Sequence, residues 1–290
     1  MGEHKRPIEI IQPSEEMVFA SQKQLENHIT SFFSEEKERL SIQKGVYNDT
    51  PQSLSSLIIE KETDREELRK KVEEIRKTQQ PVASEESKVD LLGLPDLTDG
   101  MFLDFEVINR PPYPLTWRWN TYNIFNSEHN VSVDDSGNMS WNHNSSFPSE
   151  GMASAAGVGV FFHSNIDGTL ILTPPPIRIT YEYLVNSPNP ILTTISNGWV
   201  GYYIGAVVPG DQKVDSTQQS VWSASYASSS KATRVVGVSS KSVRISQGAS
   251  YSLWMWCGGN IVSSMGFGGS SSANGSMSLN IGTIQFDVGF

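Results

Sequence analysis

The sequence predicts an α plus all-β protein of more than one domain, in which an N-terminal helical segment precedes an antiparallel β-sandwich of jelly-roll type. Composition is the first reason. Residues 1–92 hold 33 of the 54 charged residues, whereas 21 of the 23 glycines and all seven tryptophans follow them. Periodicity is the second, because apolar residues recur at helical spacing before Gly93 and at every second position after it. Composition and period that change together indicate two architectures on one chain.

A first helix is predicted from Ser14 to about Leu40. Ser14 can cap the first turn, and Glu15 and Glu16 place negative charge at the positive end of the helix dipole. Gly45 and the Asn48-Asp49 pair are expected to end the helical pattern. The apolar stripe of this helix consists of Val18, Leu25, Ile29 and Phe32.

A second helix is predicted to begin at Thr50-Pro51 and to run to residue 78, since proline fits the first position of a helix. It carries a short heptad seam with Lys61 and Arg65 in its middle. The apolar members of the seam are predicted to oligomerise the chain: Leu54, Ile58, Leu68, Val72 and Ile75. Two arrangements fit this pattern, a coiled coil between chains and a helical hairpin within one chain.

These patterns divide the chain into four parts. We expect an N-terminal arm over 1–13, a helical attachment and oligomerisation segment over 14–78, a linker over 79–92 and a β-sandwich head over 93–290.

The head is predicted from strands with alternating apolar residues, separated by turn-forming clusters of Pro, Gly, Asn and Asp. About ten short strands with no helical pattern between them are typical of a sandwich. In the last strand the alternation changes phase at Gly282, which predicts a β-bulge there. The clearest alternating series are Met101–Val107, Leu115–Trp119, Ile177–Val185 and Tyr251–Cys257.

Charge and composition exclude several function classes. The net charge of −10 and the pI near 5.0 argue against nucleic acid as a partner and against docking to anionic lipid. A single cysteine leaves no internal disulfide. No apolar stretch reaches the length of a transmembrane segment, and no signal peptide is recognisable at the start. We therefore expect synthesis in the cytoplasm, no transmembrane segment and no cofactor.

Candidate catalytic and metal-binding residues are few. Common catalytic and phosphate-binding motifs are absent from the sequence, and the five histidines lack the spacing of metal ligands. The carboxylate pair Asp104 and Glu106 is interpreted as a solvated strand face, and Asp134 and Asp135 as turn residues. Cys257 is interpreted as a small buried hydrophobe. The sequence thus predicts no catalytic residues, no metal site and no enzymatic activity.

Aromatic residues gather between positions 117 and 147 among Asn, Ser and His side chains. Flat rings among short polar side chains suit the recognition of sugars or proteins. The candidate ligand-binding residues are Trp117, Trp119, Tyr122 and Trp141.

The run from Asn130 to Trp141, Asn-Val-Ser-Val-Asp-Asp-Ser-Gly-Asn-Met-Ser-Trp, resembles a strand–turn–strand phrase of phage tail-fibre and related appendage proteins. Their layout of helical attachment, stalk and β head is also similar. The resemblance implies a homotrimeric, receptor-binding virion protein that joins other particle proteins through its N-terminal helices and attaches to a glycan or protein on the host surface. It implies no role for any single residue.

Two rival functions stay open at this level. One is a leaderless pore-forming toxin, because the Ser-rich stretch from Gln219 to Ser246 carries few charges and is weakly amphipathic. The other is a free lectin-like carbohydrate-binding module.

Overall fold

The computed structural model describes residues 6–48, 103–121, 127–145, 152–186, 194–208, 212–225, 228–263 and 272–289. The chain divides into two compact units, one of Met1–Glu35 with Phe102–Phe290 and one of Glu36–Met101. This division differs from the predicted boundary at residue 93, because the first 35 residues belong to the β unit.

The N-terminal residues enter the β unit as an edge strand. Strand β1 (Ile8–Ile10) pairs antiparallel with β6 (Met152–Ser164), and Ile8 is buried. Asn165 holds the preceding residues in place by donating hydrogen bonds to the carbonyls of Pro7 and Arg6, at 2.8 and 2.9 Å. Residues 8–10 of the predicted arm are therefore part of a sheet.

Helix α1 (Glu15–Asn48) follows, and the prediction of a helix starting at Ser14 is confirmed. The Met17 amide donates to the Ser14 hydroxyl oxygen at 3.3 Å, as in an N-cap. The helix continues through Gly45, which was expected to break it. Within the described residues, no helix is both long and apolar enough to cross a membrane.

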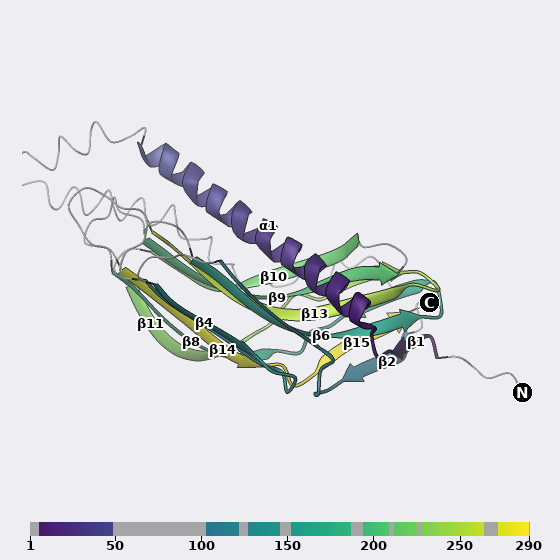
Figure 1. The fold of residues 1–290 in the computed structure, drawn as a ribbon. Helices are drawn as coiled ribbons and strands as arrows, with labels where there is room; N and C mark the ends of the chain where they lie inside the picture. Colours follow the sequence, from purple (N-terminus) through teal and green to yellow (C-terminus); the bar gives the residue numbers. More distant parts are fainter. Residues whose placement is uncertain are drawn as a thin grey trace, which may run out of the picture. The chain divides into compact units, whose positions relative to one another are not determined.

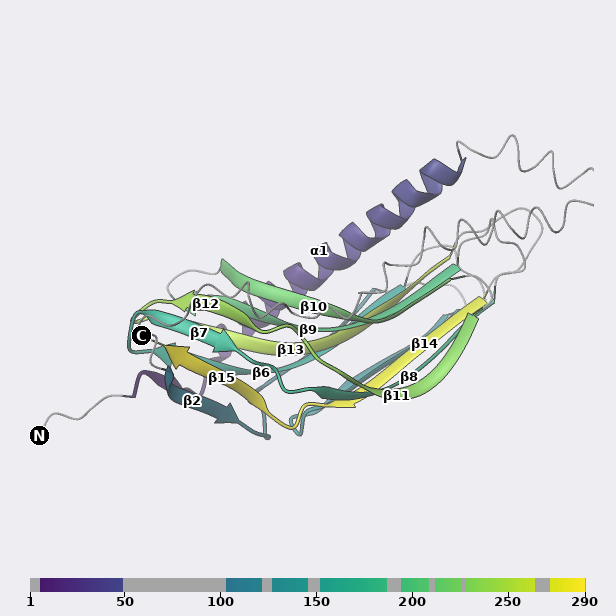
Figure 2. The same ribbon diagram turned by 180° about the vertical axis from the view of Figure 1, so that it is seen from behind.

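The strands form two layers of antiparallel sheet (Figures 1 and 2). In the first layer, β6 pairs on one edge with β1 and with β3 (Leu115–Asn120). On its other edge the order of strands is β13 (Ser250–Ser263), β9 (Thr194–Val208) and β10 (Gln212–Ser225). The second layer contains two sheets. One has the order β11 (Ser228–Val236), β8 (Ile177–Asn186), β14 (Ser272–Asn280), β5 (Asn138–Ser145) and β4 (Ser127–Val133). The other has the order β12 (Lys241–Ile245), β7 (Gly168–Leu172), β15 (Ile284–Gly289) and β2 (Leu103–Asn109).

Eight of these strands have the order of a jelly roll. The eight strands are, in chain order, β5, β6, β8, β9, β10, β11, β13 and β14. They form two four-stranded parts of the sheets, with the orders β5-β14-β8-β11 and β6-β13-β9-β10. The antiparallel sandwich predicted for this part of the chain is therefore confirmed. Neither a coiled coil nor a helical hairpin is seen among the described residues, and the predicted second helix lies outside them.

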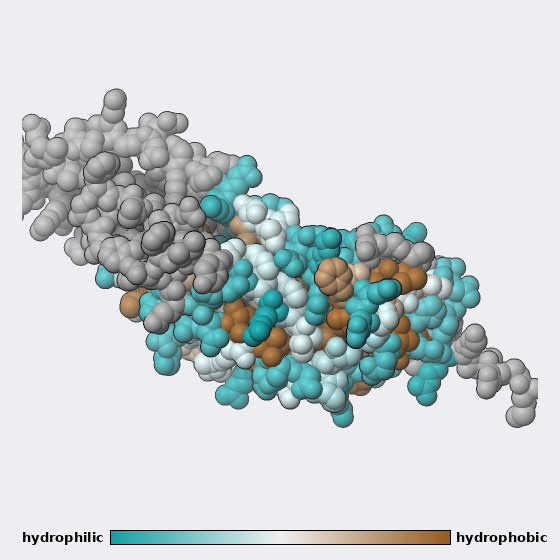
Figure 3. All heavy atoms as spheres, in the orientation of Figure 1, coloured by the Kyte–Doolittle hydropathy of each residue, from teal (hydrophilic) through white to brown (hydrophobic). Residues whose placement is uncertain are grey.

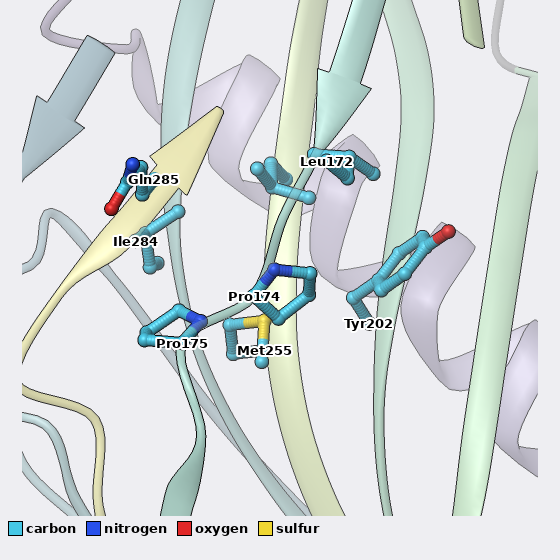
Figure 4. Close-up of a pocket in the computed structure, with 8 residues that line it drawn as sticks. Leu172, Pro174, Pro175, Tyr202, Met255, Ile284 and Gln285 are labelled. Carbon is cyan, nitrogen blue, oxygen red and sulfur yellow. The ribbon is translucent and has the colours of Figure 1, made fainter. Parts of the chain in front are cut away.

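The second layer bends because its strands break along one line (Figure 2). Strand β7 leads into β8 through Pro174-Pro175-Pro176, and β14 leads into β15 through Ile281–Thr283. The phase change at Gly282 is thus a break between two sheets, which corrects the predicted bulge. Both Leu279 and Ile284 nevertheless face the core. A small apolar pocket between the side chains of Leu172, Pro174, Met255 and Ile284 lies at the break (Figure 4).

The hairpin from Asn130 to Trp141 forms as predicted, with β4 and β5 joined by a turn at Asp134–Gly137. Asp134 accepts hydrogen bonds from the backbone and side chain of Asn138, at 3.1 and 2.9 Å, which lower the pKa of its carboxyl. Gly137 has a φ of +86°, and its carbonyl accepts a bond from the Ile281 amide at 2.9 Å. The turn therefore ties the hairpin to the break between β14 and β15.

Replacing Gly137 by alanine tests this tie. A side chain is strained at positive φ, and a Cβ at this position would overlap the Ile281 carbonyl. Gly248→Ala is the matched control, since its φ is +80° but nothing lies within 4 Å of the added atom. We expect the control to lose about 1 kcal/mol of unfolding free energy and Gly137→Ala to lose clearly more, measured by urea denaturation. Equal losses in the two variants would show that the contact with Ile281 contributes nothing to the free energy of unfolding.

Candidate functional site

The outer face of the first layer is covered by α1, and we call this face the helix groove. Small residues of β6 and β13 form its floor, so the helix can approach closely. Leu25 lies against Gly157, and Phe33 lies against Gly258 and Ala155. Figure 1 shows α1 running across β10, β9, β13 and β6. The groove is lined by Leu115, Trp117, Ala153, Ala155, Phe161, Trp199, Tyr203, Val207, Trp254 and Trp256.

Polar contacts fix the position of the helix in the groove. The indole N–H of Trp254 donates to the Ser21 hydroxyl at 2.7 Å, and both side chains are fully buried. Gln22 and Gln24 donate at 3.0 Å to the backbone carbonyls of Thr116 and Ala206. These bonds reach strands β3 and β9, which lie on either side of β6 and β13, so the helix is held across the width of the sheet.

Two of the predicted ligand-binding aromatics belong to this groove. Trp117 is buried, and Trp119 is half-buried and stacks on Phe33 with ring centroids 5.7 Å apart and an interplanar angle of 8°. Trp117 thus belongs to the apolar cluster between helix and sheet, and Trp119 packs at its edge on a helix residue. Tyr122 lies outside the described residues.

The fourth predicted residue, Trp141, lies between the two layers with 1% of its surface exposed. Its ring packs against Trp222 at 5.5 Å and against His143 at 4.9 Å. The structure therefore does not bring the four aromatics together at one surface. That they bind a ligand stays a prediction.

A Ser–His pair lies beside Trp141. His143 Nε2 is 2.6 Å from the Ser154 hydroxyl oxygen, while His143 Nδ1 has no hydrogen-bond partner among the described residues. Burial, and to a lesser degree the nearby His129, lowers the pKa of His143 to about 3, so its ring is neutral. Both side chains are fully buried, so neither is accessible from solvent.

Other residues considered from the sequence have ordinary roles here. Burial raises the pKa of the Cys257 thiol to about 12, in keeping with the predicted buried hydrophobe. Glu106 is exposed and accepts a hydrogen bond from Gln285 at 2.6 Å. No group of three His, Cys, Asp or Glu side chains among the described residues could hold a metal ion. The predicted seam residues Leu54, Ile58, Leu68, Val72 and Ile75 lie outside those residues.

The outer face of the second layer has a different chemistry. On β4, β5 and β14, each outward side chain that the structure describes is Asn or Ser, and we call this surface the polar face. Its members are Asn130, Ser132, Asn138, Ser140, Asn142, Asn144, Ser272, Asn274, Ser276, Ser278 and Asn280.

Strand register aligns these side chains in rows across the sheet. One row contains hydroxyl groups alone and continues through β8 and β11: Ser132, Ser140, Ser278, Thr180 and Thr233. The next row contains Asn130, Asn142, Ser276, Glu182 and Lys231. The last two form an ion pair at 2.8 Å, which leaves the row with no net charge.

Most of the polar face makes no internal hydrogen bonds. Asn280 bonds Asn138 at 2.9 Å, whereas the side chains of Asn130, Asn142, Ser276 and Ser278 have no hydrogen-bond partner among the described residues. Asparagine is also disfavoured in strands, so strand stability does not explain its use here. This surface was not predicted from the sequence, although Asn and Ser alternate with mostly apolar residues over 138–145 and 272–280.

Comparisons with known proteins found similarity among solved structures only. No protein-family model and no curated protein matches the chain. Among solved structures, it is similar to the crystal structure of the enzymatically active domain of tailspike protein 4 from bacteriophage CBA120. The sequence identity is 10%, the TM-score is 0.16, and the match covers 63% of this chain and 19% of the tailspike chain.

This comparison corrects one expectation. We predicted that the chain is not an enzyme, but the solved structure similar to it is an enzymatically active domain, so that prediction is withdrawn. At this TM-score the similarity establishes neither the fold nor a reaction for the present chain.

The buried His143 and the half-buried His28 predict acid sensitivity. Burial, followed by the nearby charge of Lys213, lowers the pKa of His28 to about 4, against the opposing effect of Glu35, and His143 lies near 3. An unfolded histidine titrates near 6.5. The stability that depends on neutral rings is therefore present above pH 6.5 and is lost as the pH falls towards 4, by up to about 1.4 kcal/mol per pH unit for each ring.

Urea denaturation at pH 7.5, 6.5, 5.5 and 4.5 measures this loss. The double variant His28→Gln/His143→Gln should show a clearly flatter dependence than wild type between pH 6.5 and 4.5, where most carboxylates keep their charge. An unchanged slope would mean that other groups cause the acid sensitivity.

Proposed function

We propose that the protein is a receptor-binding component of a virion or phage-like particle, and that the polar face is its recognition surface. The observation that carries the proposal is the set of outward Asn and Ser side chains on β4, β5 and β14. Short polar side chains that can form hydrogen bonds lose little conformational entropy when a ligand orders them.

The fold supports the proposal by analogy. Jelly rolls occur in viral capsid and lectin domains, although a fold alone does not decide a function. The strand–turn–strand phrase that resembles phage appendage proteins is the β4–β5 hairpin, and it supplies part of the polar face. We assign attachment to the unit of Glu36–Met101, which is distinct from the β unit that carries the polar face.

No specific observation favours the pore-forming alternative. The described part of the stretch from Gln219 to Ser246 supplies core side chains to the β unit, among them Val221, Trp222, Val243 and Ile245. Refolding this stretch as a membrane hairpin would remove those side chains from the core.

A competition assay tests the proposed function. Particles purified from lysates of the source culture are first checked for the chain, and the purified protein is then added in excess while the particles adsorb to host cells. We expect the wild-type protein to block adsorption and Ser132→Lys/Ser278→Lys to fail, since two lysines disrupt the neutral surface. The matched control is Ser220→Lys/Ser223→Lys on β10, where both serines are also exposed, and it should block as well as wild type. Absence of the chain from the particles, or equal blocking by both double variants, would contradict the proposal.

The attachment segment leads to a separate prediction. We propose that residues 51–78 pair between chains, most simply in a trimer, and that they contact other particle proteins. Leu68→Asp should then convert the oligomer to monomers, because a carboxylate buried against its own copies costs several kcal/mol, of the order of 2–7, per chain. Light scattering at micromolar concentration measures the mass, with Ser53→Asp as a control in the same segment. A monomeric wild-type protein would favour the hairpin within one chain.

A further inference from the structure

We propose that the polar face binds a neutral polyhydroxylated polymer, a polysaccharide without charged groups, laid along the row from Ser132 to Thr233. This inference rests on the proposed function and names the chemical class of its receptor.

Charge is the first argument. In a protein with a net charge of −10, the outward positions of β4, β5 and β14 hold Asn and Ser except for Glu128, which the register places opposite Asn144 at the end of the face. Nucleic acid requires a basic surface, and an acidic polysaccharide would require cations as well. Further along the face Glu182 and Lys231 are paired with each other, and Arg178 on β8 is an exposed cation beside Thr180 at the end of the row. Charges of both signs are few and lie at the margins of this face, so it has no cluster of one sign for a polyion, and a neutral ligand fits its central rows best.

Hydrogen-bonding capacity is the second argument. Hydroxyl and carboxamide groups both donate and accept, and so do the hydroxyl groups of a sugar. The side chains of Ser132, Ser140, Ser278 and Asn142 have no hydrogen-bond partner among the described residues, so these groups are open to a ligand. Thr180 and Thr233 hold each other's hydroxyls at 3.0 Å, which orders the far end of the row.

Regular spacing is the third argument. Neighbouring strands lie about 4.8 Å apart, so the five hydroxyl groups of the row extend over about 19 Å. This spacing is close to the length of one sugar unit in an extended polymer, so successive units can meet successive strands. Each neutral hydrogen bond contributes little net affinity, and a repeating ligand on a repeating surface combines several of them.

A protein partner fits the face less well. Protein interfaces are enriched in aromatic residues, Met and Arg and depleted in Ser, whereas the outward positions of β4, β5 and β14 hold no aromatic, Met or Arg residue. Among the described residues, apolar or Arg side chains on this side are confined to β8 and β11, where Arg178, Leu184 and Val235 are exposed. Figure 3, on the side that carries α1, shows apolar surface only as separate patches among hydrophilic residues. Pairing of the face with a second copy remains a distinct outcome of the test.

Affinity electrophoresis of the full chain tests the inference. The gels contain dextran, mannan or galactan as neutral probes and alginate as an acidic one. We expect at least one neutral polymer to retard the wild-type protein and alginate to leave it unaffected. Ser132→Lys/Ser278→Lys should bind that polymer about tenfold more weakly, the equivalent of one or two lost hydrogen bonds, while Ser220→Lys/Ser223→Lys binds as wild type. Thermal melting of each variant checks that the fold is kept.

The remaining outcomes overturn the inference in distinguishable ways. Retardation by none of the neutral polymers, or equal retardation of both double variants, excludes the polar face as a glycan site. If sedimentation velocity without polymer shows a wild-type oligomer that Ser132→Lys/Ser278→Lys dissociates, the face pairs with a second copy. Should the protein block particle adsorption through this face yet bind no neutral polymer, the proposed function stands and the ligand class is wrong.

Discussion

The fold depends on covering a sheet that is apolar on both faces. Every residue of β13 from Ser250 to Val262 is buried, because its alternate side chains pack in opposite directions. Leu253 and Met255 face the second layer, while Trp254 and Trp256 face the helix. An antiparallel sheet usually leaves one face to water, which here would expose the tryptophans. The N-terminal segment prevents this, and burying each large apolar side chain of α1 contributes roughly 1.5–3 kcal/mol.

Tryptophan rings in the first layer pack over glycines of the same layer. Trp254 lies over Gly159 of the neighbouring strand, Trp256 lies close to Gly201, and Trp222 covers Gly198 on the other face. Each ring fills the space that a missing side chain leaves, as when an aromatic residue compensates a glycine in a neighbouring strand. The uneven distribution of both residue types along the chain thus has a structural cause.

Local patterns predicted local elements well. The cap at Ser14, the alternating strands and the turn at Gly137 follow from preferences of neighbouring residues, and the structure contains all three. The stripe of Leu25, Ile29 and Phe32 was also recognised, but not its partner. An apolar stripe indicates that one face of a helix is buried, but it does not identify the segment that covers this face. The sheet that covers this stripe begins at Leu115, more than 80 residues beyond Phe32, so periodicity alone could not assign the helix to the β unit.

The candidate site could not be found by looking for distinctive residues. Tryptophans drew attention to residues 117–141, yet Trp117 and Trp141 are buried because large rings supply the most apolar area to a core. The polar face consists of residues that are unremarkable one at a time, and its character comes from register, which places Ser140 beside Ser132 and Ser278. Asparagine and serine weaken strands, and conflicts between local preference and structure are expected where a surface serves a function. The apolar alternation of β5 and β14 supplies the stability, so their outward positions are free to serve recognition.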